Sequence, residues 1–183
     1  SILATVEAAI GLILIALLIA YLPTLYTAFS RRERAITLLE VRAGSPPSAV
    51  EMLQRYHRLG RLDRLADLWV EWEQWFAEIE ESHTSLAMLV FFRSPNPNRS
   101  WVTASGAVLD AASLTAALVD LPRNVQIDLC IRAGYLALRE VASFFQIPFD
   151  PAPRPDERIS IDRREFDEAC DRLSQSGLAL RAD

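Results

Sequence analysis

One uninterrupted apolar segment constrains the fold of this chain more than any other feature. The 23 residues from Ala8 to Ser30 include no Asp, Glu, Lys or Arg. As an α-helix such a segment is about 34 Å long, which is enough to cross a hydrocarbon core of about 30 Å. A core helix of a soluble protein rarely needs so long an uncharged run. We therefore expect a transmembrane helix within residues 1–30, in direct contact with membrane lipid.

The charges that flank this segment predict its orientation. Glu7 precedes it, whereas Arg31, Arg32 and Arg34 follow it as a basic cluster at the membrane exit. A signal peptide has the opposite order, with a basic leader before a shorter apolar region. Basic residues beside a span stay in the cytoplasm. We expect the N-terminus outside and everything after Ser30 inside.

Composition excludes several classes of protein and suggests a source. The 183 residues carry a net charge of −5 and are 51% hydrophobic. The chain is therefore neither disordered nor basic enough to bind nucleic acid through its phosphates. All 19 basic residues are arginine, a usage typical of GC-rich bacterial genes, which predicts a bacterial plasma (inner) membrane. Two cysteines, Cys130 and Cys170, are too few for a disulfide framework or a four-cysteine zinc site.

Residues 31–46 are expected to connect the span to a separate domain. Apolar residues within them recur at helical spacing, so the transmembrane helix either runs on or breaks after Ser30. The Gly-Ser-Pro-Pro sequence that begins at Gly44 predicts a stop and a turn. Residues 47–183 are then expected to form a cytosolic α-helical domain.

Helix start and stop signals recur along this domain, and no strand pattern rises above noise. The fold class predicted is therefore all-α, with one N-terminal transmembrane helix followed by a cytosolic multi-helix domain. The signals are a cap at Ser45 or Ser48 with a stop at Gly60, a cap at Ser100 for Trp101–Asp120, a start at Pro122 with a stop at Pro148, and a capping box of Asp162 and Glu165 with a stop at Gly177.

The clearest amphipathic pattern begins at Leu62, where apolar residues recur at spacings of 3-4-3-4-3, as on one face of a long helix. Continuing the spacing places His83 on this face, provided that the helix does not break at Ser82. Trp75 lies off the face, so it is expected to pack on another subunit or on the membrane surface. The face itself comprises Leu62, Leu65, Trp69, Trp72, Phe76 and Ile79.

His83 is the one candidate for a regulatory side chain. A histidine among apolar neighbours can titrate near neutral pH and bias a conformational equilibrium, which makes His83 a possible pH-sensing residue. The alternative is a core histidine that is hydrogen-bonded to a backbone carbonyl or to a carboxylate.

The two helices that follow differ in character. Trp101–Asp120 is rich in alanine, so it can approach other helices closely and is expected to be central. The helix after Pro122 is expected to bury the large apolar residues Ile127, Ile131, Leu138 and Phe145.

Motifs for catalysis and metal binding are missing from the sequence. The six glycines form no phosphate-binding loop, no H-E-x-x-H is present, and the two histidines lie far apart. Either cysteine is more simply a small core residue than a nucleophile. We therefore expect no enzyme activity, no catalytic residue, no metal site and no cofactor.

The N-terminal segment carries a resemblance to a known family. The run TVEAAIGLILIALLIAYL, followed by FSRRER, resembles the pore-lining inner helix of two-transmembrane potassium channels. Glu7, Gly11 and Arg31–Arg32 match the outer glutamate, the packing or hinge glycine and the exit cluster of that helix. The selectivity filter of such channels, of the kind T-x-G-[YF]-G, does not occur in these residues. Because the chain begins without methionine and opens directly into the span, we expect a fragment whose filter lies upstream.

This resemblance implies a potassium-channel-like subunit, a homo-tetramer, with potassium as its ion. The face formed by Gly11, Ile15, Leu18 and Leu22 would line the pore, and Pro23 would loosen the helix near the gate. The domain would regulate or assemble the channel. The alternative is a single-span anchor that displays a cytosolic protein-interaction module, in which Gly11 and Pro23 only shape the anchor helix.

Overall fold

The computed structural model describes residues 2–154 and 161–181 of the chain. These residues form six α-helices and two short 3-10 helices, and their only β-type pairing is a bridge between Val119 and Leu180. The predicted all-α class is confirmed. The α-helices are α1 (Ile2–Ala43), α2 (Ala49–Arg58), α3 (Leu65–Ser85), α4 (Trp101–Ala117), α5 (Val125–Phe144) and α6 (Arg163–Gln175), and the 3-10 helices are η1 (Leu62–Arg64) and η2 (Ala87–Phe91).

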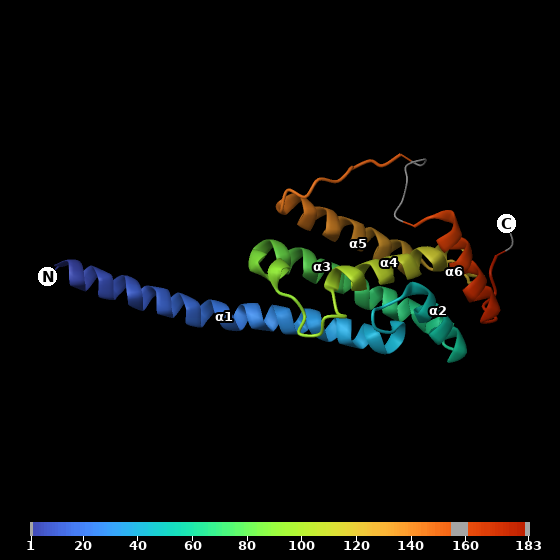
Figure 1. Ribbon diagram of the computed structural model, residues 1–183, viewed down its shortest axis with the longest axis horizontal. Coiled ribbons are helices and arrows are strands. Elements are labelled where there is room, and N and C mark those ends of the chain that lie inside the picture. The colour runs from blue at the N-terminus through green and yellow to red at the C-terminus, as the bar shows by residue number, and fades with distance from the viewer. Residues whose placement is uncertain (1, 155–160, 182–183) are drawn as a thin grey trace.

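Helix α1 is continuous, and its two halves lie in different environments. The first half projects alone from the bundle, whereas the second half lies along it (Figure 1). Every large apolar side chain of α1 before Leu25 is exposed, while Ile36, Leu39 and Ala43 are fully buried. Among the described residues, α1 is the one helix long and apolar enough to cross a membrane. The structure therefore contains the predicted long apolar N-terminal helix followed by a multi-helix domain.

The end of α1 is fixed by the turn that the sequence predicts. Gly44 has a φ of 80°, in the left-handed region that glycine adopts without strain, and a Cβ there would collide with the Glu51 carboxylate. Pro46 and Pro47 follow in the turn, and Ser48 caps α2 by accepting a hydrogen bond from the Glu51 amide. The chain therefore reverses within five residues, and α2 packs against α1.

The core contains residues of the segment that was expected to be a connector. Ile36 and Leu39 are completely buried, which stabilises the fold by about 1.5–3 kcal/mol for each side chain. They belong to one cluster with Trp69 and Phe76 of α3 and with the small residues of α4. Helix α4 packs against α1, α2 and α5 and buries four of its alanines, in keeping with the central position predicted for it. The second half of α1 is thus an integral helix of the domain.

Helix α5 differs from its prediction in both its start and its buried face. It begins at Val125, not near Pro122, because Asn124 accepts a hydrogen bond from the Gln126 amide and so caps the helix later. The predicted face is confirmed for Ile127 and only in part for Ile131, Leu138 and Phe145, which are partly buried. The residues that α5 buries instead are mostly small, namely Cys130, Gly134, Ala137 and Val141.

Trp75 was also predicted wrongly, because it is buried within this chain, with 5% of its surface exposed. Helix α3 packs against both α1 and α5, so its buried arc is wider than a single stripe. The Trp75 ring lies 4.4 Å from the Trp72 ring and 5.5 Å from the Phe76 ring, centroid to centroid. His83 completes the same helix face, as expected for an α3 that continues past Ser82.

A pair of glycine substitutions tests how closely α5 approaches α3. A Cβ at Gly134 would lie 2.6 Å from Cδ2 of Leu109 and 2.9 Å from the Phe76 ring. Gly134→Ala should therefore lower the free energy of unfolding by about 1–3 kcal/mol through overpacking. Gly106→Ala is the matched control in α4. No atom lies within 4 Å of its added Cβ, and alanine favours helix by about 0.5–1 kcal/mol. Chemical denaturation should show that Gly134→Ala lowers the free energy of unfolding and that Gly106→Ala raises it. An increase for both variants would contradict the close packing at Gly134.

Candidate functional site

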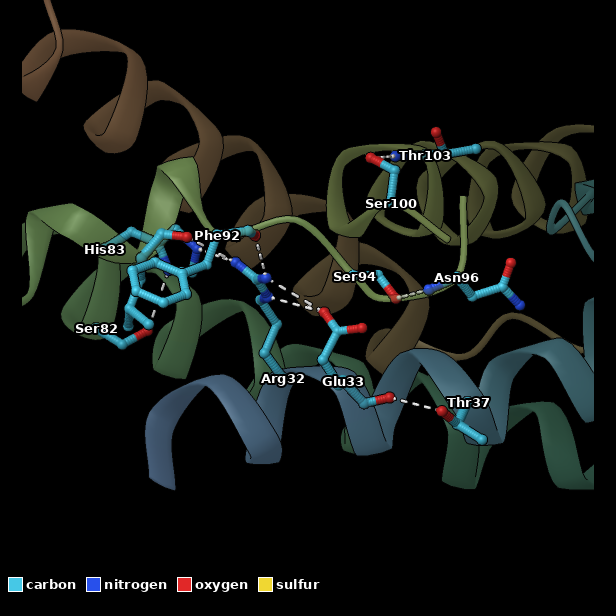
Figure 2. Close-up of polar contacts among 11 residues, drawn as sticks. Arg32, Glu33, Thr37, Ser82, His83, Phe92, Ser94, Asn96, Ser100 and Thr103 are labelled. Carbon is cyan, nitrogen blue, oxygen red and sulfur yellow. Dashed lines mark hydrogen bonds and ion pairs between the residues drawn. The ribbon is translucent and has the colours of Figure 1, made fainter. Parts of the chain in front are cut away.

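The most unusual polar side chain of the described chain is Arg32, where α1 enters the domain. Only 3% of Arg32 is exposed, although only Arg31 separates it from the apolar segment. It lies on the same helix face as Ile36 and Leu39, one turn before the first of them. Figure 2 shows its guanidinium pointing from α1 toward α3 and the chain around Phe92. We call Arg32, Glu33, His83 and the carbonyls of Leu89 and Phe92 the arginine junction.

All five N–H donors of the Arg32 guanidinium have an acceptor within this junction. Nε and Nη2 bind Oε1 of Glu33 at 3.3 and 3.2 Å. Nη1 donates to the Leu89 carbonyl at 2.9 Å, and Nη2 donates to the Phe92 carbonyl at 2.6 Å. The remaining Nη1 donor faces Nε2 of His83 at 3.3 Å. Because a buried charge is tolerated only when it is paired and hydrogen-bonded, this complete set explains why Arg32 can lie in the core.

The junction fixes the tautomer of His83. Arginine can only donate, so Nε2 of His83 must accept and the ring proton must lie on Nδ1. Nδ1 is 3.1 Å from the Ser82 hydroxyl oxygen, which itself donates to the Glu78 carbonyl, and the Ile79 carbonyl also accepts from the ring. Both ring nitrogens are therefore satisfied only in the neutral imidazole.

Electrostatics favour the same neutral form. Burial, and after it the positive charge of Arg32, together lower the pKa of His83 to about 4, although the hydrogen bond to the Ile79 backbone acts in the opposite direction. This environment therefore does not support the expectation that His83 titrates near neutral pH. It supports the stated alternative, a core histidine bonded to a backbone carbonyl. Burial also lowers the pKa of Arg32, while the Glu33 carboxylate opposes that shift.

Aromatic rings shield the junction from water. The Arg32 guanidinium lies 5.1 Å from the centre of the Phe29 ring, one turn earlier on α1. The Phe29 and Phe92 rings are 6.0 Å apart, and the His83 and Trp101 rings are 4.8 Å apart. Side chains from α1, α3 and α4 thus meet here with the chain that follows η2.

A second ion pair on α1 holds the other end of the loop between η2 and α4. Nε and Nη2 of Arg99 bind Oε2 of Glu40 at 2.8 and 2.6 Å, and the Ser45 hydroxyl donates to Oε1 of Glu40. These bonds, first among them the one from Arg99, lower the pKa of Glu40. Arg32 and Glu40 therefore attach both ends of the loop to α1. A hollow of about 590 Å³ remains between the loop and α1, with Glu33, Ser94 and Arg99 among its lining residues.

The structure separates the three arginines that were expected to form one exit cluster. Arg31 and Arg34 are exposed, whereas Arg32 is committed to the junction and cannot meet lipid headgroups. A sequence signal for this difference exists, because Arg32 continues the spacing of Ile36, Leu39 and Ala43, while Arg31 and Arg34 do not.

The predicted pore-lining residues lie on the projecting half of α1 and meet no other element of the described chain. Ile15, Leu18 and Leu22 are more than half exposed, and nothing lies within 4 Å of a Cβ added to Gly11. Pro23 lies inside α1, which continues through it, and the Pro23 carbonyl accepts a hydrogen bond from Thr27 at 2.7 Å.

Within the described residues, no group of three or more His, Cys, Asp or Glu side chains is placed to hold a metal ion. Comparison with family models, with curated proteins and with solved structures finds no match for this chain.

Proposed function

We propose that this chain is a single-span membrane anchor that displays a rigidly attached helical module. The observation that carries the proposal is α1 itself, which is exposed and apolar in its first half and part of the domain core in its second. An exposed apolar helix of this length is unfavourable in water and suits a bilayer. The arginine junction suits a rigid attachment, because it fixes the domain to α1 where the apolar half ends.

The proposed orientation places the domain in the cytoplasm of a bacterial cell and the N-terminus outside. Two exposed arginines, Arg31 and Arg34, supply the basic flank on the domain side, and Glu7 is the charged residue on the other side. Such a module would act by presenting its helical surface to protein partners at the membrane.

Membrane integration is tested by fractionating cells that express the full chain. The protein should stay with the membranes through an alkaline carbonate wash. The double variant Ile15→Arg/Leu18→Arg should be extracted, because a charge at the centre of a span costs about 2.5–3.5 kcal/mol per residue. Both side chains are exposed in the structure, so the domain should keep its fold. Leu59→Arg, at another exposed leucine, is the control that should remain in the membrane. Extraction of the unmodified chain would refute the anchor.

A second candidate function is the inner helix of a tetrameric potassium-channel-like assembly. What favours it is the open face around Gly11, which would let copies of α1 pack closely, together with the rigid link from α1 to the domain. Single cysteines at Ile15, Leu18 and Leu22 should then cross-link between copies in native membranes, and potassium flux should require the assembled protein. A chain that stays monomeric in mild detergent and gives no cross-links would exclude this candidate.

A further inference from the structure

Two uncharged segments lie together at one end of the helical bundle. One comprises residues 86–92, which include η2, and the other comprises residues 141–149, at the end of α5. Both α3 and α5 run toward the projecting half of α1, so these segments face the same side (Figure 1). Their large exposed side chains are Met88 (53% exposed), Phe91 (68%), Phe92 (42%), Phe144 (48%), Ile147 (54%) and Phe149 (41%).

Ring contacts join these segments to each other and to α1. Phe92 contacts Phe29 of α1, and its neighbour Phe91 lies 5.9 Å from Phe145, which lies 5.1 Å from Phe144. Five of the eight phenylalanines of the chain therefore lie in two groups of contacting rings, which meet where Phe91 and Phe92 adjoin in the chain. We call the exposed residues Met88, Phe91, Phe92, Phe144 and Ile147 the apolar end of the domain.

The apolar end lies level with the last turns of the apolar half of α1. A hollow between α1 and the end of α3 is lined by Pro23, Thr27 and Arg31 on one side and by Ser82 and Leu86 on the other. Helix α3 therefore reaches back along α1 by about two turns from Arg31, or about 12 Å at 1.5 Å per residue. If the bilayer extends to Ser30, the apolar end must enter it. If the bilayer stops near Leu22, the apolar end still rests on its surface.

We propose that the apolar end of the domain inserts into the bilayer interface, in the leaflet from which α1 emerges. The proposal rests on the proposed membrane anchor and adds a second lipid contact to it. The occupant is lipid, because the surface is continuous with the lipid-facing half of α1.

Charges at the rim of the apolar end suit lipid headgroups. Arg93 follows the first segment and is exposed, and Arg31 is exposed on α1. Arg139 lies two residues before the second segment, with its guanidinium 5.9 Å from the centre of the Phe149 ring, and the exposed acidic residues Glu140 and Asp150 directly flank the segment. Aromatic side chains flanked by arginine are typical of surfaces that lie in the headgroup region and attract anionic lipids. The domain would thus lie against the membrane.

The test places an environment-sensitive fluorophore on the full chain in vesicles of phosphatidylcholine and phosphatidylglycerol. Phe91→Cys and Ile147→Cys each carry the label, one on each segment, in a Cys170→Ser background. Cys130 is left in place, because it is fully buried and burial raises the pKa of its thiol to about 12. Leu59→Cys is the matched control, since Leu59 is 69% exposed, like Phe91, and directly follows α2, which lies at the opposite end of the bundle (Figure 1).

Nitroxide-bearing lipids should remove most of the fluorescence at positions 91 and 147 and leave position 59 unchanged. Quenching at 91 and 147 no greater than at 59 would overturn the proposal, provided that circular dichroism shows native helicity. A fourth label at Ile15 separates this failure from failure of the anchor. If position 15 is quenched and 91 and 147 are not, only the apolar-end proposal fails; if position 15 is also unquenched, the anchor fails too.

Discussion

Replacing Arg32 with methionine should lower the free energy of unfolding by about 3–5 kcal/mol, the usual cost of removing one partner from a buried charged network. Methionine fills much of the volume of the arginine stem but donates no hydrogen bond. The carbonyls of Leu89 and Phe92 and the carboxylate of Glu33 would each lose their donor. Denaturant unfolding of the full chain in detergent micelles, followed by circular dichroism, measures the loss.

The neighbouring arginine supplies a matched control for this prediction. Arg31 pairs with Glu78 at 3.9 Å, and both side chains are at least half exposed. Such a surface pair contributes about 0–1 kcal/mol, so Arg31→Met should change stability little. The loss of stability in Arg32→Lys should lie between those of the two methionine variants. An ammonium keeps the charge but lacks the planar fork of the guanidinium, which meets acceptors on three elements. Equal losses for the two methionine variants would show that the arginine junction contributes no more than a surface pair.

The features that local sequence determines could be predicted. The long helix follows from an uncharged run that few other structures accommodate, and the all-α class follows from repeated caps and stops. Ser48, Ser100 and Asp162 each cap the helix that the sequence assigned to it, and Asp162 with Glu165 forms the predicted capping box. These signals act over three or four residues, so they do not depend on how the rest of the chain packs.

What depends on tertiary packing could not be predicted in the same way. The close packing of α5 at Gly134 depends on the Phe76 ring, which lies on another helix. A small residue is buried where another helix approaches closely. Hydrophobicity alone would instead predict burial of the larger apolar residues beside it. Trp75 illustrates the converse, because its burial requires α1 and α5 to cover two sides of α3.

Arg32 combines both kinds of information. Its position after an apolar segment favours a membrane-exit residue, while its helical spacing with Ile36 and Leu39 favours the core. The second signal prevails because the chain places four acceptor atoms around the guanidinium, which together make five hydrogen bonds; two of the four are backbone carbonyls near η2. No sequence pattern indicates that the carbonyls of Leu89 and Phe92, about sixty residues further along the chain, will accept hydrogen bonds from Arg32.

Acidification should destabilise the domain through His83, by up to about 3 kcal/mol between pH 6.5 and pH 4. The pKa of His83 is about 4 in the folded protein, against an ordinary value of 6.5 for the unfolded chain. Above pH 6.5 neither state binds the proton, so the stabilisation from the neutral imidazole is complete. Between pH 6.5 and 4 only the unfolded chain binds the proton, so the free energy of unfolding falls by about 1.4 kcal/mol for each pH unit of acidification. Below pH 4 both states are protonated and the loss ends.

The groups that face the imidazole explain why protonation is resisted. The Arg32 guanidinium from α1 meets Nε2, Ser82 on α3 meets Nδ1, and the Trp101 ring from α4 covers the side. Glu33 is the nearest carboxylate in the arginine junction, but it is bound to Arg32. A protonated His83 would turn a second donor toward Arg32 and place two positive charges side by side.

His83→Gln isolates this contribution, since carboxylates also titrate in the same range. Glutamine can still accept from Arg32 with its amide oxygen but cannot take up a proton. The free energy of unfolding of this variant should therefore depend less steeply on pH between 6.5 and 4. His57→Gln, at the other histidine of the chain and on α2, should retain the slope of the unmodified protein. If His83→Gln and the unmodified protein lose stability in parallel, the buried imidazole is not the group that couples this fold to acid.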